Sequence, residues 1–148
     1  MEVDQMQLEV IKSHPDALIP KYAHLSDSGL DLYSIEEAYI QPNETISIRT
    51  GIRINLPVGT EAQIRPRSGL AFKKSITILN TPGTIDQGFT GEIVILMINH
   101  GKEKFLIEKH MRIAQMVIAP IIKVNITEVA SFPNKDRNEK GFGSTGLY

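Results

Sequence analysis

One carboxylate near the middle of the chain, Asp86, stands in a segment that could hold it against a ligand. The segment, Thr81–Glu92 (TPGTIDQGFTGE), lies between the apolar runs Ser75–Leu79 and Ile93–Ile98. Its glycines and proline predict a β-hairpin or a tight β-arch. Backbone N–H and C=O groups at such a turn can read the edge of a planar ligand, and a carboxylate there can deprotonate a water. Because aspartate also suits turns for conformational reasons alone, other segments must decide.

Further groups in the sequence could complete a site for a phosphorylated ligand. Asn80, whose amide both donates and accepts hydrogen bonds, precedes the aspartate, and Phe89 follows it with a flat apolar ring. Arg67, Ser68 and Gly69 put a guanidinium, a hydroxyl and a glycine amide side by side, where a strand ends and a short helical turn begins. This set suits phosphate oxygens. By itself, the same triplet also fits a plain turn with an exposed arginine.

Two polar residues that interrupt apolar segments have more than one interpretation. Asp31, in GLDL, could cap a turn, pair with a cation or stand near a metal. Gln115, in RIAQMVI, could be a satisfied core amide or a ligand-binding group. Both alternatives stay open at the level of the sequence.

The C-terminal segment 131–148 lacks a core-forming face but ends in an unusual motif, GFGSTG. Glycines on both sides of Phe142 let the backbone approach a ligand and lay the ring over it, while Ser144 and Thr145 can cradle a phosphate. A flexible glycine–serine tail is the alternative. A purely flexible tail has little structural reason to place a phenylalanine between two glycines, which favours a tail that closes over a ligand.

Composition restricts the class of protein. The chain has 148 residues, a formal net charge of -1 and a sequence pI near 6.4, so we expect neither a nucleic-acid nor a membrane partner. It has no cysteine, and its four histidines are scattered without metal-ligand spacing. The acidic start, Met1–Lys12, has no basic region followed by an apolar run, and no apolar run could span a bilayer. We therefore expect a cytoplasmic protein.

Apolar periodicity predicts many short strands and almost no helix. Turn signals recur every eight to twelve residues or so, which is typical of an all-β fold: a sandwich, a jelly roll or a barrel. We expect a β domain over residues 1–130 and a tail over 131–148. The run Ile93–Ile98 is apolar on both faces, and one of them could be covered by a neighbouring subunit. The expected strands are Met6–Ile11, Leu30–Ser34, Glu36–Ile40, Ile46–Leu56 with a break at Gly51, Glu61–Ile64, Ser75–Leu79, Ile93–Ile98, Lys104–Ile107, Arg112–Ala119 and Lys123–Val129.

Taken together, these segments resemble the trimeric deoxyuridine triphosphate nucleotidohydrolases, the dUTPases. All five motifs of that family occur in order, and although each is weak alone, the set at compatible spacings is specific. The motifs are SDSGLDLYS at Ser26–Ser34, PRSGLA at Pro66–Ala71, NTPGTIDQGFTGEI at Asn80–Ile93, RIAQMVI at Arg112–Ile118 and an arginine followed by FGSTG within Arg137–Gly146.

The resemblance implies a β jelly-roll homotrimer that hydrolyses dUTP to dUMP and pyrophosphate with Mg²⁺, each site lying between subunits and completed by a neighbour's tail. It implies that Asp86 activates the attacking water and that Asp31 is a structural acid, at most near the metal. The triphosphate and water would hold most of the Mg²⁺. The implied substrate-binding residues are Asn80, Thr84, Ile85 and Phe89 for the nucleoside, Arg67, Ser68, Gly69 and Gln115 for phosphates, and Arg137, Phe142, Gly143, Ser144 and Thr145 in the tail.

The chain departs from the family pattern at three places. Phe89 stands where many members have tyrosine, Asn138–Lys140 replaces a stretch that is often glycine-rich, and Thr90 replaces a longer polar residue. A related dCTP deaminase is the alternative enzyme, although we find no extra acid near Asp86 for attack at the pyrimidine C4. A jelly-roll trimer serving only as a binding or capsid-like module is the alternative outside enzymes.

Overall fold

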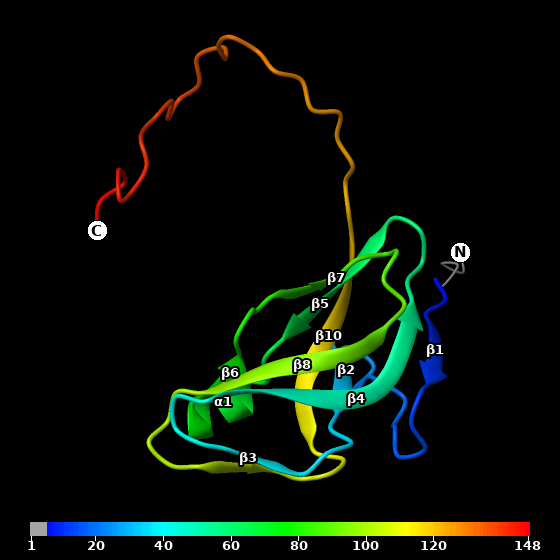
Figure 1. Cartoon of the computed structure of the whole chain (residues 1–148). Helices are drawn as coiled ribbons and strands as arrows, with labels where there is room; N and C mark the ends of the chain where they lie inside the picture. Colours follow the sequence, from blue (N-terminus) through cyan, green and yellow to red (C-terminus); the bar gives the residue numbers. More distant parts are fainter. Residues whose placement is uncertain (1–5) are drawn as a thin grey trace.

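The computed structural model describes residues 6–148 as an all-β body with one short helix and a long C-terminal segment (Figure 1). The expectation about the N-terminal leader falls largely on residues 1–5, which lie outside the described residues. In the described part, no helix is long and apolar enough to cross a membrane. The elements are β1 (Glu9–Lys12), β2 (Leu30–Tyr33), β3 (Ala38–Ile40), β4 (Thr45–Asn55), β5 (Thr60–Arg65), α1 (Ser68–Lys74), β6 (Ile76–Ile78), β7 (Gly83–Ile85), β8 (Glu92–Asn99), β9 (Phe105–Ile107) and β10 (Arg112–Pro120).

Two four-stranded sheets, with strand orders β1-β4-β8-β6 and β2-β10-β5-β7, form the body, and β3 pairs with β9 beside them. All these pairings are antiparallel. Apart from β3 and β9, successive strands alternate between the two large sheets, as in the predicted jelly roll. The expected break at Gly51 is a register shift between Arg49 and Arg53 inside one continuous strand, β4. There Gly51 has φ +67, a conformation that favours glycine.

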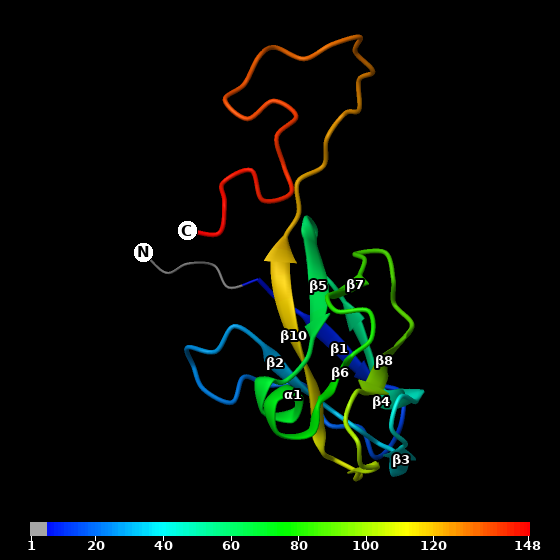
Figure 2. The ribbon, with the colours of Figure 1, turned by 90° about the vertical axis from the view of Figure 1, so that its left-hand side faces the viewer.

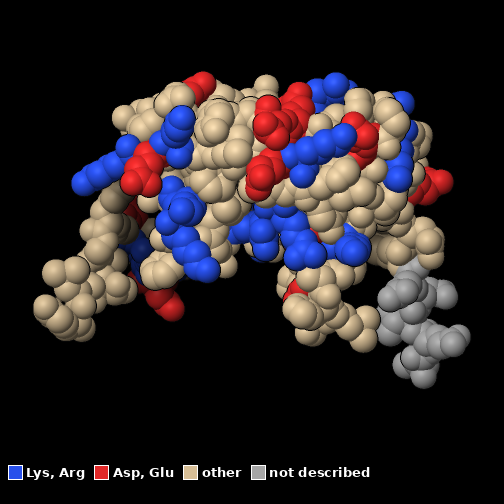
Figure 3. All heavy atoms as spheres, turned by 90° about the horizontal axis from the view of Figure 1, so that it is seen from below, with Lys and Arg blue, Asp and Glu red and all other residues tan. Residues whose placement is uncertain are grey.

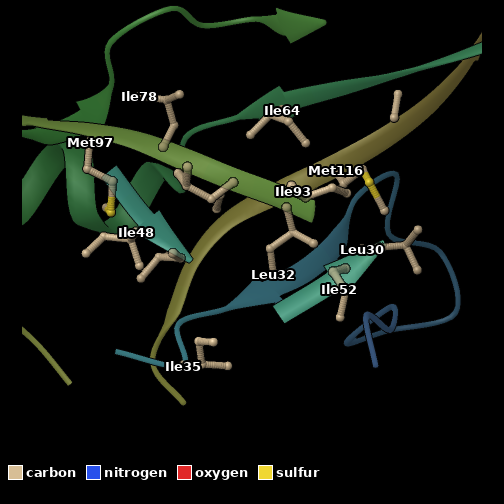
Figure 4. Packing of buried hydrophobic residues seen from close by; sticks show 14 of the residues in the cluster. Leu30, Leu32, Ile35, Ile48, Ile52, Ile64, Ile78, Ile93, Met97 and Met116 are labelled. Carbon is tan, nitrogen blue, oxygen red and sulfur yellow. The ribbon is translucent and has the colours of Figure 1, made fainter. Parts of the chain in front are cut away.

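The core lies between the two sheets, and strand alternation fills it. In β8, Ile93, Ile95 and Met97 are buried against Leu32 and Ile48 (Figure 4). Each such side chain stabilises the fold by roughly 1.5–3 kcal/mol relative to exposure. Alternation within β8 leaves its other face apolar but uncovered in the single chain.

The outer face of β8 is apolar and exposed in the single chain. Val94 is 43% exposed and Leu96 37% exposed, although both sit in a central strand of the sheet. A polar outer face would be expected if this surface met only water. The apolar face is therefore a surface suited to covering by another chain.

One predicted strand is wrong, and five others (β1, β2, β3, β6 and β9) are shorter than predicted by one or two residues. The alternation at Lys123–Val129 predicted a strand, but no strand is assigned after β10, and residues 122–148 are all exposed. Figures 1 and 2 show this segment leaving the body beyond β10, where no neighbouring strand can pair with it. Alternating side chains alone cannot hold a strand whose backbone groups lack a partner. At the other end, β1 begins at Glu9 rather than Met6, and β3 begins at Ala38 rather than Glu36.

The segment Thr81–Glu92 forms an arch rather than a simple hairpin. The strands before and after it, β6 and β8, pair in one sheet, whereas the segment itself contributes β7 to the other sheet. β7 lies at the edge of that sheet and, in the part of the chain that the structure describes, pairs only with β5. One row of its backbone N–H and C=O groups therefore faces outward, free to meet a ligand.

Candidate functional site

The predicted phosphate-binding residues gather at the start of α1. Arg67, Ser68 and Gly69 line a depression of about 120 Å³ together with Asp31 and Gln115. Arg67 takes the N-cap position in an extended conformation, so the helix starts where β5 has ended. Its Nη1 donates to the carbonyl oxygen of Arg112 at 3.2 Å, which ties the guanidinium to β10. The residues of three sequence motifs thus form one small polar surface.

The structure gives Gln115 a definite role in that surface. Its Nε2 donates to the carbonyl oxygen of Pro66 at 2.9 Å, so the amide on β10 holds the bend that precedes α1. Gly29 makes room for it, because a Cβ at residue 29 would lie only 2.4 Å from the Gln115 Oε1. Gly29 belongs to the first motif but was not among the predicted site residues. The need for a glycine at residue 29 becomes visible only when the pairing of β2 with β10 is known.

Asp31 is an ion-pair partner, which resolves one of the alternatives left open by the sequence. Its Oδ2 lies 3.4 Å from Nε of Arg112, and its residue exposure is 9%. Because the two residues sit on adjacent strands, the pair braces β2 against β10 under the depression. This contact supports the interpretation of Asp31 as a structural acid.

The predicted nucleoside-binding residues gather at the other end of β5, around β7. Thr84 and Ile85 lie in β7, opposite Gln63 and Ala62 of β5. Asp86 follows at the strand end with an exposed side chain, and the N–H of Phe89 donates to the carbonyl oxygen of Asp86 at 3.0 Å. The carboxylate is thus presented to solvent by a closed turn.

Two side chains that were not predicted hold this turn. Gln87 accepts a hydrogen bond from the N–H of Gly59 at 2.9 Å, and Arg53 donates from Nε to the carbonyl oxygen of Thr90 at 2.6 Å. Their types alone give no signal, since glutamine in a turn and arginine on a strand are ordinary. The contacts depend on the packing of the arch against the β4–β5 connection.

Phe89 and Asn80 flank the turn. Phe89 is 46% exposed, and its ring lies over Gly91, where an added Cβ would meet the ring Cζ at 2.7 Å. Asn80 points its amide toward Gly83, whose hypothetical Cβ would lie 3.1 Å from Nδ2. An aromatic side chain and an open strand edge therefore adjoin Asp86 in the sequence, and the Asn80 amide lies beside Gly83 at the start of β7.

The two groups of residues do not meet within one chain. In the β5–β7 register, Asp86 falls opposite Glu61, and Arg67 lies six residues further along. At about 3.3 Å per strand residue, this places the two roughly 20 Å apart. Figure 1 shows α1 and the turn after β7 at opposite ends of β5. A ligand that touched both groups of one chain would have to span this separation.

The tail residues stand apart from both groups. Arg137, Phe142, Gly143, Ser144 and Thr145 are all exposed. The tail has local turns only, such as the bond from the N–H of Ser144 to the carbonyl oxygen of Gly141 at 3.1 Å. Gly143 has φ +82, as a tight turn in this motif requires. In the single chain, the motif is thus available to a site elsewhere.

Charge on the surface is unevenly distributed (Figure 3). A basic surface lies around the end of α1 and the β8–β9 loop and consists of Lys73, Lys74, Lys102 and Lys104. These lysines line a depression together with His100 and Glu103. Lys104 stands 4.6 Å from the centroid of the Tyr39 ring.

Within residues 6–148, no group of three or more histidine, aspartate or glutamate side chains is arranged to hold a metal ion.

Comparison with known proteins places these features in a family. The family model described as dUTPase matches residues 16–146. The chain is 59% identical over 140 residues to the deoxyuridine 5'-triphosphate nucleotidohydrolase of Clostridioides difficile, covering 95% of this chain and 98% of that protein. It is 61% identical over 131 residues to the protein of the same name from Alkaliphilus metalliredigens, covering 88% and 91%.

Solved structures agree with these sequence relatives. A point mutant of the dUTPase of Staphylococcus bacteriophage 80alpha, with dUpNHpp, superposes with a TM-score of 0.91 at 28% identity and covers 97% of this chain and 100% of that one. A polar depression at α1, an exposed carboxylate on an edge arch, the five motifs and these matches have one common explanation: the chain belongs to the dUTPase family of deoxyuridine 5'-triphosphate nucleotidohydrolases.

Proposed function

We propose that the protein hydrolyses dUTP to dUMP and pyrophosphate, with Asp86 as the base that activates water. The observation that carries this mechanism is the exposed carboxylate at the end of β7, next to the open backbone edge of that strand. The names of the sequence relatives and the nucleotide analogue in the phage structure support the choice of substrate.

The uracil would be read by the arch. Backbone groups of Thr84 and Ile85 at the free edge of β7 and the Asn80 amide match the alternating donors and acceptors of uracil, and cytosine would present a donor where uracil accepts. A rigid backbone close to C5 excludes the methyl group of thymine by contact. Phe89 packs under the sugar and leaves no space for a 2′-hydroxyl, which an apolar pocket otherwise rejects poorly.

The phosphates would bind Arg67, Ser68, Gly69 and Gln115 of a second subunit. The separation of roughly 20 Å between Arg67 and Asp86 within one chain, together with the uncovered apolar face of β8, supports a homotrimer with sites between subunits. The tail, residues 131–148, would close over the nucleotide of a neighbouring site. Arg137 would contact phosphate, Phe142 would cover the uracil, and Gly143, Ser144 and Thr145 would enclose the terminal phosphate.

The chemical step needs positioning more than a covalent nucleophile. Asp86 takes a proton from a water molecule as its oxygen attacks the α-phosphorus in line with the leaving group. The new bond joins the water oxygen to the α-phosphorus, the bond from that phosphorus to the bridging oxygen breaks, and pyrophosphate leaves with the bridging oxygen. Base catalysis of this kind contributes about 10²–10⁴-fold.

The residues at the proposed site fit a magnesium ion held by the substrate. A hard cation prefers oxygen ligands and keeps several waters, so the triphosphate can supply its direct ligands. Asp31 is paired with Arg112 at 3.4 Å, which leaves it at most a place behind such waters. When bound, the ion neutralises phosphate charge and fixes the conformation of the triphosphate. A related phage enzyme is described with a structural Mg(II) ion.

Pyrophosphate release from dUTP, dTTP, dCTP and UTP, each with and without Mg²⁺, tests the proposal. We expect release from dUTP alone, strongly enhanced by Mg²⁺. Ammonia released from dCTP would favour the deaminase alternative. Absence of turnover on all four nucleotides would favour a binding module and contradict the proposed function.

A further inference from the structure

Gly59, in the connection between β4 and β5, joins two parts of the molecule that the proposed reaction needs. Its N–H donates to Oε1 of Gln87 at 2.9 Å, and its carbonyl oxygen accepts from the N–H of Ile121 at 3.0 Å. Gln87 adjoins Asp86 in the turn after β7, and Ile121 is the first residue after β10, where the chain leaves the body on its way to the tail at residues 131–148. The turn that carries Asp86 and this exit point, here called the base of the tail, are therefore bonded to the same peptide.

The connection that carries Gly59 is itself well held. The N–H and the hydroxyl of Thr60 both donate to the carbonyl oxygen of Pro57, at 3.3 and 2.7 Å. Gly59 has φ +80, a left-handed conformation that glycine adopts without strain. The Gly59 peptide is thus held in one position by its own connection, and a neighbouring turn that bonds to it is held in place as well.

The Asp86 carboxylate, by contrast, is not held by contacts of its own side chain within the described residues. Within residues 6–148 it makes no hydrogen bond or ion pair, so the backbone of its turn alone determines where it points. β7 holds that backbone only as far as Ile85, the last residue paired with β5. Beyond this point the side-chain contact from Gln87 is the nearest attachment to the body. Arg53 holds the far end of the arch at Thr90.

We propose that Gln87 is a positioning residue for the proposed reaction: by accepting the Gly59 N–H, it fixes the Asp86 turn in the same frame as the base of the tail. This inference rests on the proposed function, because its consequence is measured in turnover. Loss of the hydrogen bond lets the Asp86 turn sample other orientations. The nucleotide still binds, but fewer complexes hold the carboxylate in line with the attacking water.

Gln87→Leu removes the accepting oxygen at nearly constant size, and Gln87→Glu keeps an accepting oxygen. Gln41→Leu is the matched control, since Gln41 is an exposed glutamine outside the proposed site. For Gln87→Leu we expect kcat for dUTP to fall about three- to tenfold, the range that one lost hydrogen bond can produce. We expect KM to stay within about twofold, because the side chain is not among the groups proposed to touch nucleotide.

Gln87→Glu should recover most of the lost kcat on the alkaline plateau of its pH profile. A residue that served folding only would lower the melting temperature without changing kcat of the folded protein. The melting temperature of every variant is therefore measured, and we expect Gln87→Leu to lower it by no more than about 3 °C, because one hydrogen bond contributes about 1 kcal/mol.

A variant at the other end of the arch covers the case in which Gln87→Leu unfolds. Arg53→Met removes the contact with Thr90 and should also lower kcat with little change in KM. Where Gln87→Leu folds, the double variant should show a kcat loss that differs from the product of the single losses, because both contacts hold one turn. If Gln87→Leu matches the unsubstituted protein in kcat, or Gln87→Glu loses as much as Gln87→Leu, the inference is wrong. If the unsubstituted protein itself fails to hydrolyse dUTP, the proposed function has failed instead.

Discussion

Substituting Gly29 by alanine should damage the phosphate-binding surface, although none of the predicted phosphate-binding residues is replaced. A Cβ at residue 29 would lie 2.4 Å from Oε1 of Gln115, 3.0 Å from its Cβ and 3.2 Å from its Cδ. The first contact alone could be relieved by rotating the amide. The other two require the stem of Gln115, and hence β10, to shift away from β2.

The magnitude follows from what that shift breaks. Gln115 would lose its bond to the carbonyl oxygen of Pro66, now 2.9 Å long, which contributes about 1 kcal/mol. Forcing the two strands apart costs a further 1–3 kcal/mol or so, as in other overpacked sites. For a chain of this size, a total of roughly 2–4 kcal/mol lowers the melting temperature by about 5–15 °C.

The assay combines thermal unfolding with dUTP kinetics. Gly29→Ala should lower the melting temperature and raise KM for dUTP about tenfold, as the bend before α1 loses its support. Gln115→Ala, which lacks the collision at the amide, should lose less stability but a similar amount of affinity. Gly69→Ala is the control for stability, because its Cβ would meet nothing within 4 Å. An unchanged melting temperature and KM in Gly29→Ala would refute this account of Gln115.

Three other perturbations have definite expected results. Truncation after Val129 should abolish dUTP turnover yet leave the melting temperature of the body within a few degrees, since the removed residues are exposed; lost cooperative unfolding would contradict this. The bidentate contact with Arg49, at 2.8 and 2.9 Å, holds the pKa of Glu92 below its ordinary value. The stabilisation that this ion pair gives the folded state is thus fully present at neutral pH and is lost as the pH falls below about 4. Glu92→Gln should destabilise by about 1 kcal/mol at pH 7 and flatten the acid side of the stability curve, measured by urea unfolding. Gly91→Ala should push the Phe89 ring from its place and reduce discrimination of dUTP against UTP, measured as the ratio of their kcat/KM values; an unchanged ratio would contradict the role of the ring.

Much of the fold could be predicted from sequence because its strands alternate cleanly. β4, β8 and β10 follow the periodicity closely, and the apolar run of β8 has one buried face and one exposed face in the single chain. The failure at Lys123–Val129 has a general cause: side-chain alternation reports that a segment could form a strand, whereas pairing depends on which neighbours the fold provides. The arch of Thr81–Glu92 was underspecified for the same reason, since sheet exchange leaves no local signal.

The site could be predicted as a set of residues but not as a shape. Motif spacing singled out Asp86 and Arg67, yet only strand register shows that one chain keeps them roughly 20 Å apart. The supporting contacts of Gly29 and Gln87 come from packing across strands distant in sequence. Such contacts are invisible until the strands are paired.

Turnover of dUTP by Asp86→Asn tests the central claim most directly. The substitution keeps the size and hydrogen-bonding capacity of the side chain but removes its ability to take a proton. The account predicts that pyrophosphate release falls by about 10²–10⁴-fold, while the dissociation constant for a non-hydrolysable dUTP analogue and the melting temperature stay nearly unchanged. Turnover within a fewfold of the unsubstituted protein would contradict it.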